Sequence, residues 1–218
     1  HHHKHNSKTY GANVGSYPIM TTANYADSSS TERFAYRASR HPLTILFGYV
    51  TIFGFGMCVR PLIYNFRQHL DALLALVLHG VLLVWLASIQ FDVMLLGMFV
   101  PAWIASMLGA YLFYAQHNFP AAKYKSRDEW TRVEAALHSS SYIPMGAFMS
   151  WMTGNIGYHH VHHLNHKIPF YRLPAAMRAI PELQQPGTTT LTFAGIRECL
   201  RLKLWSPEHE RMVGLDGS

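Results

Sequence analysis

The sequence is poor in charged residues. Asp, Glu, Lys and Arg make up 14% of its 218 residues, against about 25% in typical soluble domains. Half of the residues are hydrophobic, and they stand in long blocks rather than in short periodic runs. An ordinary soluble domain does not need such blocks, so the composition favours burial in lipid.

Other signals are also absent. The two cysteines, Cys58 and Cys199, are too far apart for a thiolate metal site, and two cysteines do not make a disulfide framework. The sequence contains no glycine-rich phosphate loop, no His-Glu-x-x-His motif and no Gly-x-Ser-x-Gly motif, which argues against nucleotide enzymes, zinc proteases and serine hydrolases. The basic residues behind the net charge of +6 flank the apolar blocks. They indicate a membrane surface and no nucleic acid.

Two uncharged stretches, Ala72 to Phe91 and Val93 to Ala122, are each long enough to cross a bilayer as a helix. We expect membrane spans at about 70–90 and 92–116. Lys and Arg lie before the first span and after the second, which places both outer ends in the cytoplasm. A shorter apolar stretch, Pro42 to Val59, would put the histidines on opposite faces if it crossed. We therefore expect an interfacial or re-entrant segment at about 42–62.

Nine of the 15 histidines fall in two short clusters, His1 to His5 and His159 to His166. His159, His162 and His163 have the spacing H-x-x-H-H, which brings three imidazoles to one face of a helix. His2 and His5 repeat the i, i+3 relation, with Asn6 in place of a second histidine. Imidazole suits Zn, Cu, Fe and Ni, so spacing alone does not choose the metal.

His117 directly follows the second span, so it falls on the same predicted membrane face as both clusters. Ligands that are distant in the sequence can then assemble just beneath the headgroups. The opening run of histidines could also be the remnant of an expression tag. The clusters favour native sequence, and without an initiator methionine we expect the chain to be truncated at its front.

The run from Thr153 to Leu164, continued by Ile168-Pro169 and Tyr171, closely resembles the third histidine box of membrane fatty acid desaturases. His2 to Thr9 resembles a second box. Further segments are similar to bacterial acyl-lipid desaturases of the omega-6 (delta-12) type: Gln116 to Phe119, Asp128 to Trp130, Glu134 to Leu137 and Ser140 to Tyr142. Arg40 to Leu43 also resembles the family. The resemblance covers almost the whole chain, but the family's first box is absent, Asn6 departs from the pattern, and His138 stands where an acidic residue is expected.

The resemblance implies a single all-α desaturase domain over 1–218, an integral membrane protein with two transmembrane helices, an interfacial helix and a cytosolic histidine-rich cap that holds two metals. It implies two iron ions, O2 as co-substrate and removal of two hydrogens from an acyl chain. By the same resemblance, the iron ligands are His2, His5, His117, His159, His162 and His163. It further implies an acyl-lipid substrate, an external electron donor (ferredoxin, or cytochrome b5) and the bacterial inner membrane as location, and the truncated chain is expected to be inactive.

Several alternatives stay open. The same iron chemistry serves hydroxylases and ketolases that act on lipids, alkanes or carotenoids. A membrane metal-binding or transport protein is a third hypothesis, but a transporter would place polar ligands inside its spans.

Asp128, Glu129 and Glu134 are candidates to hydrogen-bond the ligand imidazoles. The apolar residues between Pro144 and Met152 would either line an acyl tunnel or lie at the membrane interface.

Overall fold

A computed structural model describes residues 17, 19–125 and 131–217. His2 and His5, the proposed ligands near the start of the chain, lie outside these residues, as do Asp128 and Glu129. The described chain is mostly helical and divides into two compact units. One unit is Ala38–Leu112, and the other combines the described parts of His1–Arg37 and Phe113–Ser218. We call them the hairpin unit and the histidine unit.

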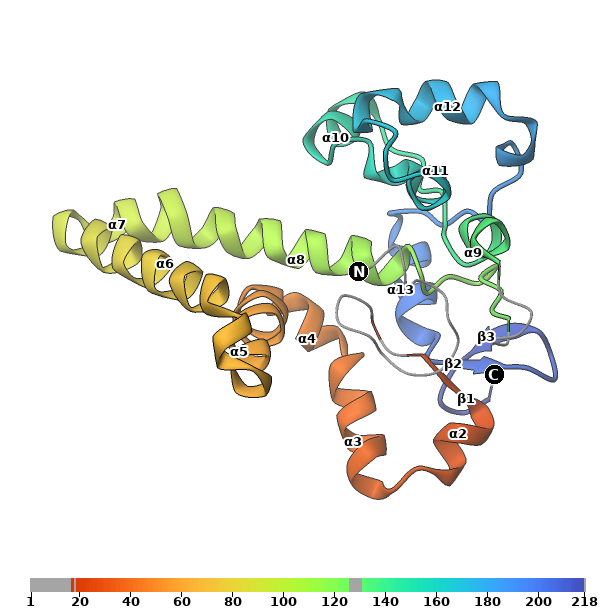
Figure 1. The fold of residues 1–218 in the computed structure, drawn as a ribbon, viewed down its shortest axis with the longest axis horizontal. Coiled ribbons are helices and arrows are strands. Elements are labelled where there is room, and N and C mark those ends of the chain that lie inside the picture. Colours follow the sequence, from red (N-terminus) through yellow and green to blue (C-terminus); the bar gives the residue numbers. More distant parts are fainter. Residues whose placement is uncertain (1–16, 18, 126–130, 218) are drawn as a thin grey trace. The chain divides into compact units, whose positions relative to one another are not determined.

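The hairpin unit is built from helices alone in the described chain (Figure 1). In order they are α4 (Pro42–Leu46), the π-helix η1 (Tyr49–Val59), α5 (Arg60–Tyr64), the 3-10 helix η2 (Phe66–Gln68), α6 (Leu70–Ile89), α7 (Phe91–Met94), the π-helix η3 (Leu95–Phe99) and most of α8 (Val100–Ala115). The extended backbone of Gln90 separates α6 from α7 and forms the turn of a helical hairpin.

The two arms of this hairpin are Leu70–Ile89, of 20 residues, and Phe91–Ala115, of 25 residues, in which α7, η3 and α8 run on without a break. Both are long and apolar enough to cross a membrane. A core helix of a soluble protein would be mostly buried. In these two helices, 0% and 6% of the most apolar 18-residue stretch is buried in the protein. The expectation of two helices of membrane-spanning length is confirmed.

The segment before the hairpin packs against both of its arms. Gly48 lies so close to α8 that a Cβ there would stand 3.0 Å from the carbonyl oxygen of Ser106. Trp103 of α8 donates its indole N–H to the carbonyl of Leu46 at 2.8 Å. The Tyr49 hydroxyl hydrogen-bonds His79, the tenth residue of α6. Whether this segment is interfacial or re-entrant stays a prediction.

The histidine unit contains a small sheet that the sequence did not predict. Strand β1 (Met20–Thr21) pairs in parallel with β2 (Leu204–Ser206), and β2 pairs antiparallel with β3 (Arg211–Val213). The helices α2 (Thr22–Asp27) and α3 (Ser30–Ser39) follow β1, and α13 (Phe193–Arg201) precedes β2. Because these strands are only two or three residues long, the all-α class is confirmed with this addition.

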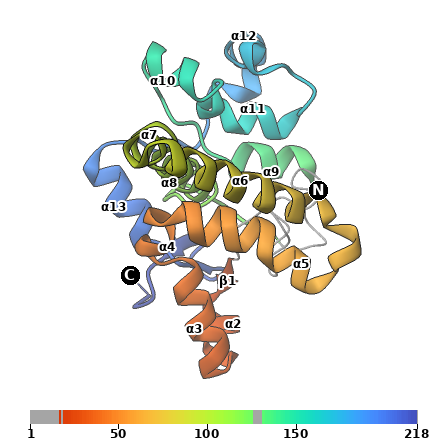
Figure 2. The ribbon, with the colours of Figure 1, turned by 90° about the vertical axis from the view of Figure 1, so that its left-hand side faces the viewer.

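The remaining helices of this unit carry the second histidine cluster. They are α9 (Arg132–His138), α10 (Ala147–Met152), the 3-10 helix η4 (Ile156–Tyr158), α11 (His159–Leu164), the 3-10 helix η5 (Phe170–Arg172), α12 (Leu173–Ala179) and the 3-10 helix η6 (Pro181–Leu183). Helix α11 lies between α12 and α9 (Figure 2). Val161 on α11, Leu173 and Leu183 form a buried apolar cluster, so burial of one face of α11 fixes the helix that carries the histidines on its other side.

Candidate metal centre

Three imidazoles from two parts of the chain meet in the histidine unit. His117 lies two residues beyond the end of α8, and His159 and His163 lie four residues apart on α11. The Nε2 atom of His159 is 2.9 Å from Nε2 of His117 and 2.9 Å from Nε2 of His163. One ligand atom from each residue lies within 4.8 Å of the other two, and His159 and His163 are buried. We call these three residues the histidine trio.

The tautomer of His117 follows from its other ring nitrogen. Nδ1 of His117 is 3.0 Å from the carbonyl oxygen of Ser139. A carbonyl can only accept a hydrogen bond, so Nδ1 carries the proton and Nε2 presents a lone pair to the trio. This is the arrangement by which metal-binding histidines in proteins are held in one tautomer and orientation.

One proton on His159 cannot serve both of its short contacts within the trio. Each Nε2 has one in-plane position, filled either by a proton or by a lone pair, yet Nε2 of His159 faces two other nitrogens at 2.9 Å. A single proton there would have to be shared between two acceptors. A cation accepts three lone pairs at once, and nitrogens bound about 2.1 Å from one metal lie about 3.0 to 3.4 Å apart. The two contacts of His159 are close to that spacing, and imidazoles are donors that many metals accept, so the trio is a candidate metal site.

The end of α8 is held by hydrogen bonds to distant backbone. The buried Gln116 donates its amide to the carbonyl of Ile156, just before α11, at 2.8 Å. Asn118 donates to the carbonyl of Cys199 at 2.7 Å and to that of Leu202 at 3.0 Å. Since buried carbonyls need partners, these amides fix both the loop that holds His117 and its distance from α11.

A tight turn leads the chain into α11. Gly154 and Asn155 both have left-handed backbone, with φ of 59° and 56°, a conformation that glycine adopts freely and asparagine tolerates. Gly157 then passes directly against Ile143: the Ile143 N–H donates to the Gly157 carbonyl at 2.9 Å, and a Cβ on Gly157 would overlap the Ile143 carbonyl oxygen. Only glycine allows this approach.

His162, the third histidine of the H-x-x-H-H motif, stands beside the trio rather than within it. Its ring lies nearly parallel to that of His159, with 5.8 Å between their centroids. Burial lowers the pKa of His162, and the nearby His166 lowers it further. A lowered pKa keeps the imidazole neutral, which is the form that binds metal. His162 thus lies beside the trio, and its part in a metal site stays a prediction.

His160 faces the opposite way and belongs to the packing. It is fully buried, 5.9 Å from the ring of Tyr142. Burial lowers the pKa of His160 to about 4, although the carbonyls of Leu183 and Ser141 raise it in part. The imidazole of His160 therefore stays uncharged near neutral pH. In the H-x-x-H-H motif, the three histidines of the pattern lie in or beside the trio, and His160, the second residue of the motif, packs in the protein interior.

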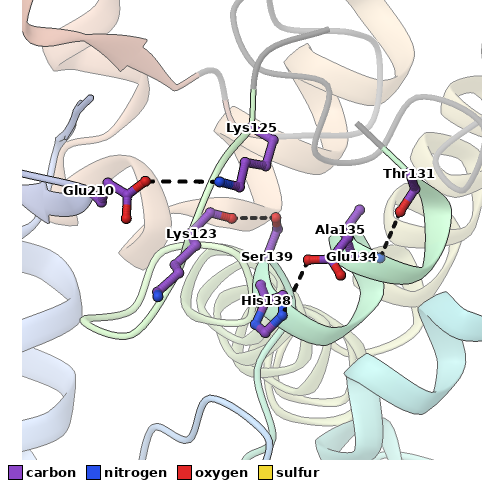
Figure 3. A pocket seen from close by; sticks show the side chains of 8 residues that line it. All are labelled: Lys123, Lys125, Thr131, Glu134, Ala135, His138, Ser139 and Glu210. Carbon is purple, nitrogen blue, oxygen red and sulfur yellow. Dashed lines mark hydrogen bonds and ion pairs between the residues drawn. The ribbon is translucent and has the colours of Figure 1, made fainter. Parts of the chain in front are cut away.

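A charged hollow lies beside α9, and Ser139, whose carbonyl contacts His117, is part of its lining (Figure 3). Its lining is Lys123, Lys125, Thr131, Glu134, Ala135, His138, Ser139 and Glu210. Lys125 approaches Glu210 at 3.9 Å, and His138 approaches Glu134 at 3.4 Å. Glu134, a candidate partner of the ligand imidazoles, thus contacts His138, and the carbonyl of Ser139 takes that role toward His117.

Sequence reasoning named His117, His159, His162 and His163, and the structure brings three of these four together. It missed Ser139 as the partner of His117 and Gly157 as the residue that lets α11 approach. A backbone carbonyl leaves no trace in side-chain identity, so the sequence held no signal for Ser139. The sequence shows Gly157 within the Gly-Tyr-His-His run, but it does not show that the backbone of Ile143 lies against this glycine in the fold.

The fold and the trio together define a mostly helical protein that has two helices of membrane-spanning length and a histidine cluster just beyond the end of the second. The family model for fatty acid desaturases matches residues 1–193. The chain therefore belongs to the fatty acid desaturase family.

Individual relatives agree with this assignment. A fatty acid desaturase of Bacillus subtilis is 36% identical over 110 residues, which cover 50% of this chain and 31% of that protein. The chloroplastic omega-6 fatty acid desaturase of Arabidopsis thaliana is 28% identical over 99 residues (43% and 22%), and that of Brassica napus is 28% identical over 88 residues (38% and 20%). The matched region thus spans about a third or less of each curated relative.

Proposed function

We propose that this chain is part of an oxygen-dependent di-iron desaturase that introduces a double bond into the acyl chain of a membrane lipid. The observation that carries the proposal is the histidine trio, in which imidazole nitrogens from two distant parts of the chain converge closely enough to hold a metal ion. Membership of the desaturase family supports it.

In this proposal His117, His159 and His163 hold one iron. His162, together with His2 and His5, supplies ligands toward the second, and the carbonyl of Ser139 holds His117 in the tautomer that binds. Iron held there and reduced by an external donor would supply O2 activation, the chemistry by which an acyl chain would lose two hydrogens from adjacent carbons while O2, two electrons and two protons would give two waters. Ferredoxin is the proposed donor, with cytochrome b5 as the alternative.

The chain itself contributes orientation and shielding. Gln116 and Asn118 fix the segment around His117 by donating hydrogen bonds to the backbone carbonyls of Ile156 and Cys199. The buried apolar cluster on the opposite face of α11 keeps water from that side of the site. Neutral imidazoles leave the metal charge uncompensated, unlike a carboxylate site. We propose the cytoplasmic face of a bacterial inner membrane as the location, because Lys and Arg flank both outer ends of the hairpin.

Omega-6 regiochemistry is the finer part of the proposal. It rests on the names of two plant relatives, both omega-6 fatty acid desaturases, and on the resemblance noted in the sequence. A lipid hydroxylase or ketolase with the same metal centre is the second candidate, and the product distinguishes the two: a new double bond leaves the lipid without added oxygen, whereas hydroxylation adds one oxygen atom.

The test uses the whole gene product, expressed in a bacterium whose lipids lack the new double bond. We expect about two irons per chain, and we expect His159→Ala and His163→Ala each to reduce bound iron and product by about 100-fold or more, since even residues that only support metal ligands cost 10- to 100-fold. His209→Ala, an exposed histidine in the turn after β2, is the control and should leave both unchanged. Bound zinc with full product in both trio variants would refute the proposal.

A further inference from the structure

Helix α10 of the histidine unit exposes an apolar face. Phe148, Trp151 and Met152 are 70%, 76% and 60% exposed. Their spacing of i, i+3 and i+4 places them on one side of the helix, and no residue of α10 is buried. Large side chains this exposed, and gathered on one face, mark a surface that contacts something other than water.

Two aromatic residues of η5 extend this surface. Phe170 and Tyr171 are 60% and 62% exposed. The turn that follows α10 touches Phe170: Asn155 donates its amide to the Phe170 carbonyl at 3.1 Å, and a Cβ on Gly154 would lie 3.6 Å from the Phe170 ring. We call Phe148, Trp151, Met152, Phe170 and Tyr171 the aromatic patch.

The charged residues of the segment that carries the patch have one sign. Between Glu134 and Glu182 the sequence contains no Asp or Glu, and its only Lys and Arg are Lys167, Arg172 and Arg178. All three are exposed, and Arg172 directly follows Tyr171. Aromatic side chains next to exposed basic ones are the composition of segments that lie in the headgroup layer of an anionic bilayer.

This unit is also joined covalently to a helix that is long and apolar enough to cross a membrane. The last residues of α8, a helix of membrane-spanning length, belong to the histidine unit. His117 follows that helix by two residues, and its Nε2 is 2.9 Å from His159 at the start of α11. Only six residues separate Met152 from His159. The patch is therefore carried by the same short part of the chain that meets the end of the apolar helix.

We propose that the aromatic patch is a membrane-surface contact, which inserts at headgroup level into a bilayer that contains anionic lipid, with Lys167, Arg172 and Arg178 facing the lipid phosphates. It is a second attachment to the membrane, separate from the helical hairpin. This resolves the two alternatives that the sequence left for the residues before the histidine box: a tunnel lining would be enclosed by the protein, whereas Phe148 and Trp151 are not. The contact does not depend on the proposed reaction.

The test places an environment-sensitive fluorophore (NBD) on single cysteines introduced by Phe148→Cys and Trp151→Cys. The protein is reconstituted in vesicles of phosphatidylcholine with about a third phosphatidylglycerol, and quenchers are attached to the lipids at a shallow or a deep acyl position. Leu78→Cys on α6 is the reference for a lipid-facing site, and Glu208→Cys in the exposed turn after β2 is the reference for water. The unmutated chain, whose Cys58 and Cys199 are buried, gives the labelling background.

We expect probes at 148 and 151 to be quenched several-fold more by the shallow label than by the deep one, and several-fold more than the probe at 208. Replacing Lys167, Arg172 and Arg178 together by Gln should reduce that quenching without changing the signal at 78. Three results would overturn the proposal: probes at 148 and 151 that behave like the one at 208, probes shielded from water but not quenched by lipid, which would show a protein partner, or strongest quenching by the deep label.

Discussion

The hairpin unit and the histidine unit distribute polarity in opposite ways. On α6 of the hairpin unit, large apolar side chains such as Leu78 and Val84 are exposed, and the imidazole of His79 turns inward to Tyr49. In the histidine unit, polar side chains such as Gln116 and Asn118 are buried and bonded to backbone carbonyls. The difference is a contrast in polarity within one chain: apolar side chains face outward in the first unit, and polar side chains are buried in the second.

We expect the largest effect when leucine is replaced by alanine at one position in each unit and the two losses of stability are compared. Leu173→Ala removes a buried side chain from the cluster under α11 and should lower the free energy of unfolding by about 2 to 5 kcal/mol. Leu78→Ala removes an exposed one and should cost less than about 0.5 kcal/mol, because lipid tails are as apolar as leucine.

Denaturant titration of the purified protein in mixed micelles, followed by circular dichroism, measures both variants. Equal losses of stability at the two positions would show that α6 packs against protein rather than lipid, and the proposed contrast between the units would then be wrong.

A second prediction concerns the approach of α11 to Ile143. Gly157→Ala should lower stability by about 1 to 3 kcal/mol, because the added methyl group overlaps a carbonyl oxygen that cannot move without shifting α11. The same shift should reduce bound iron in the gene product. Gly146→Ala, which meets nothing within 4 Å, is the matched control and should change stability by less than about 0.5 kcal/mol.

Metal analysis and thermal unfolding of both glycine variants decide this. If Gly157→Ala kept its full iron content, the position of α11 would not depend on the close backbone contact, and the description of how the trio is positioned would need revision.

The smallest predicted effect lies in the hairpin unit. Tyr49→Phe and His79→Leu each remove one partner of the hydrogen bond between η1 and α6, and the coupling between them should be about 0.6 kcal/mol, the average for hydrogen bonds between membrane helices. A double-mutant cycle measures the coupling: the double variant should cost less than the sum of the two single variants. Strict additivity would mean that the two side chains do not stabilise each other.

Local patterns in the sequence were sufficient for much of this protein. The length and composition of residues 70–115 predict two apolar helices, because helix formation and apolar length are properties of a continuous segment. The H-x-x-H-H spacing predicts a helix with imidazoles gathered on one side, because i, i+3 and i+4 neighbours are fixed by helical geometry. The family resemblance followed from the same runs of residues.

Only the tertiary structure decided which histidines meet. His117 is 42 residues from His159, yet it joins the trio, while His162 stands outside it within the same motif. The pairing of β1 with β2 joins segments more than 180 residues apart, and the tautomer of His117 is set by a main-chain oxygen. Contacts of this kind depend on where the backbone passes, and every residue type has the same carbonyl, so no pattern of side chains records them.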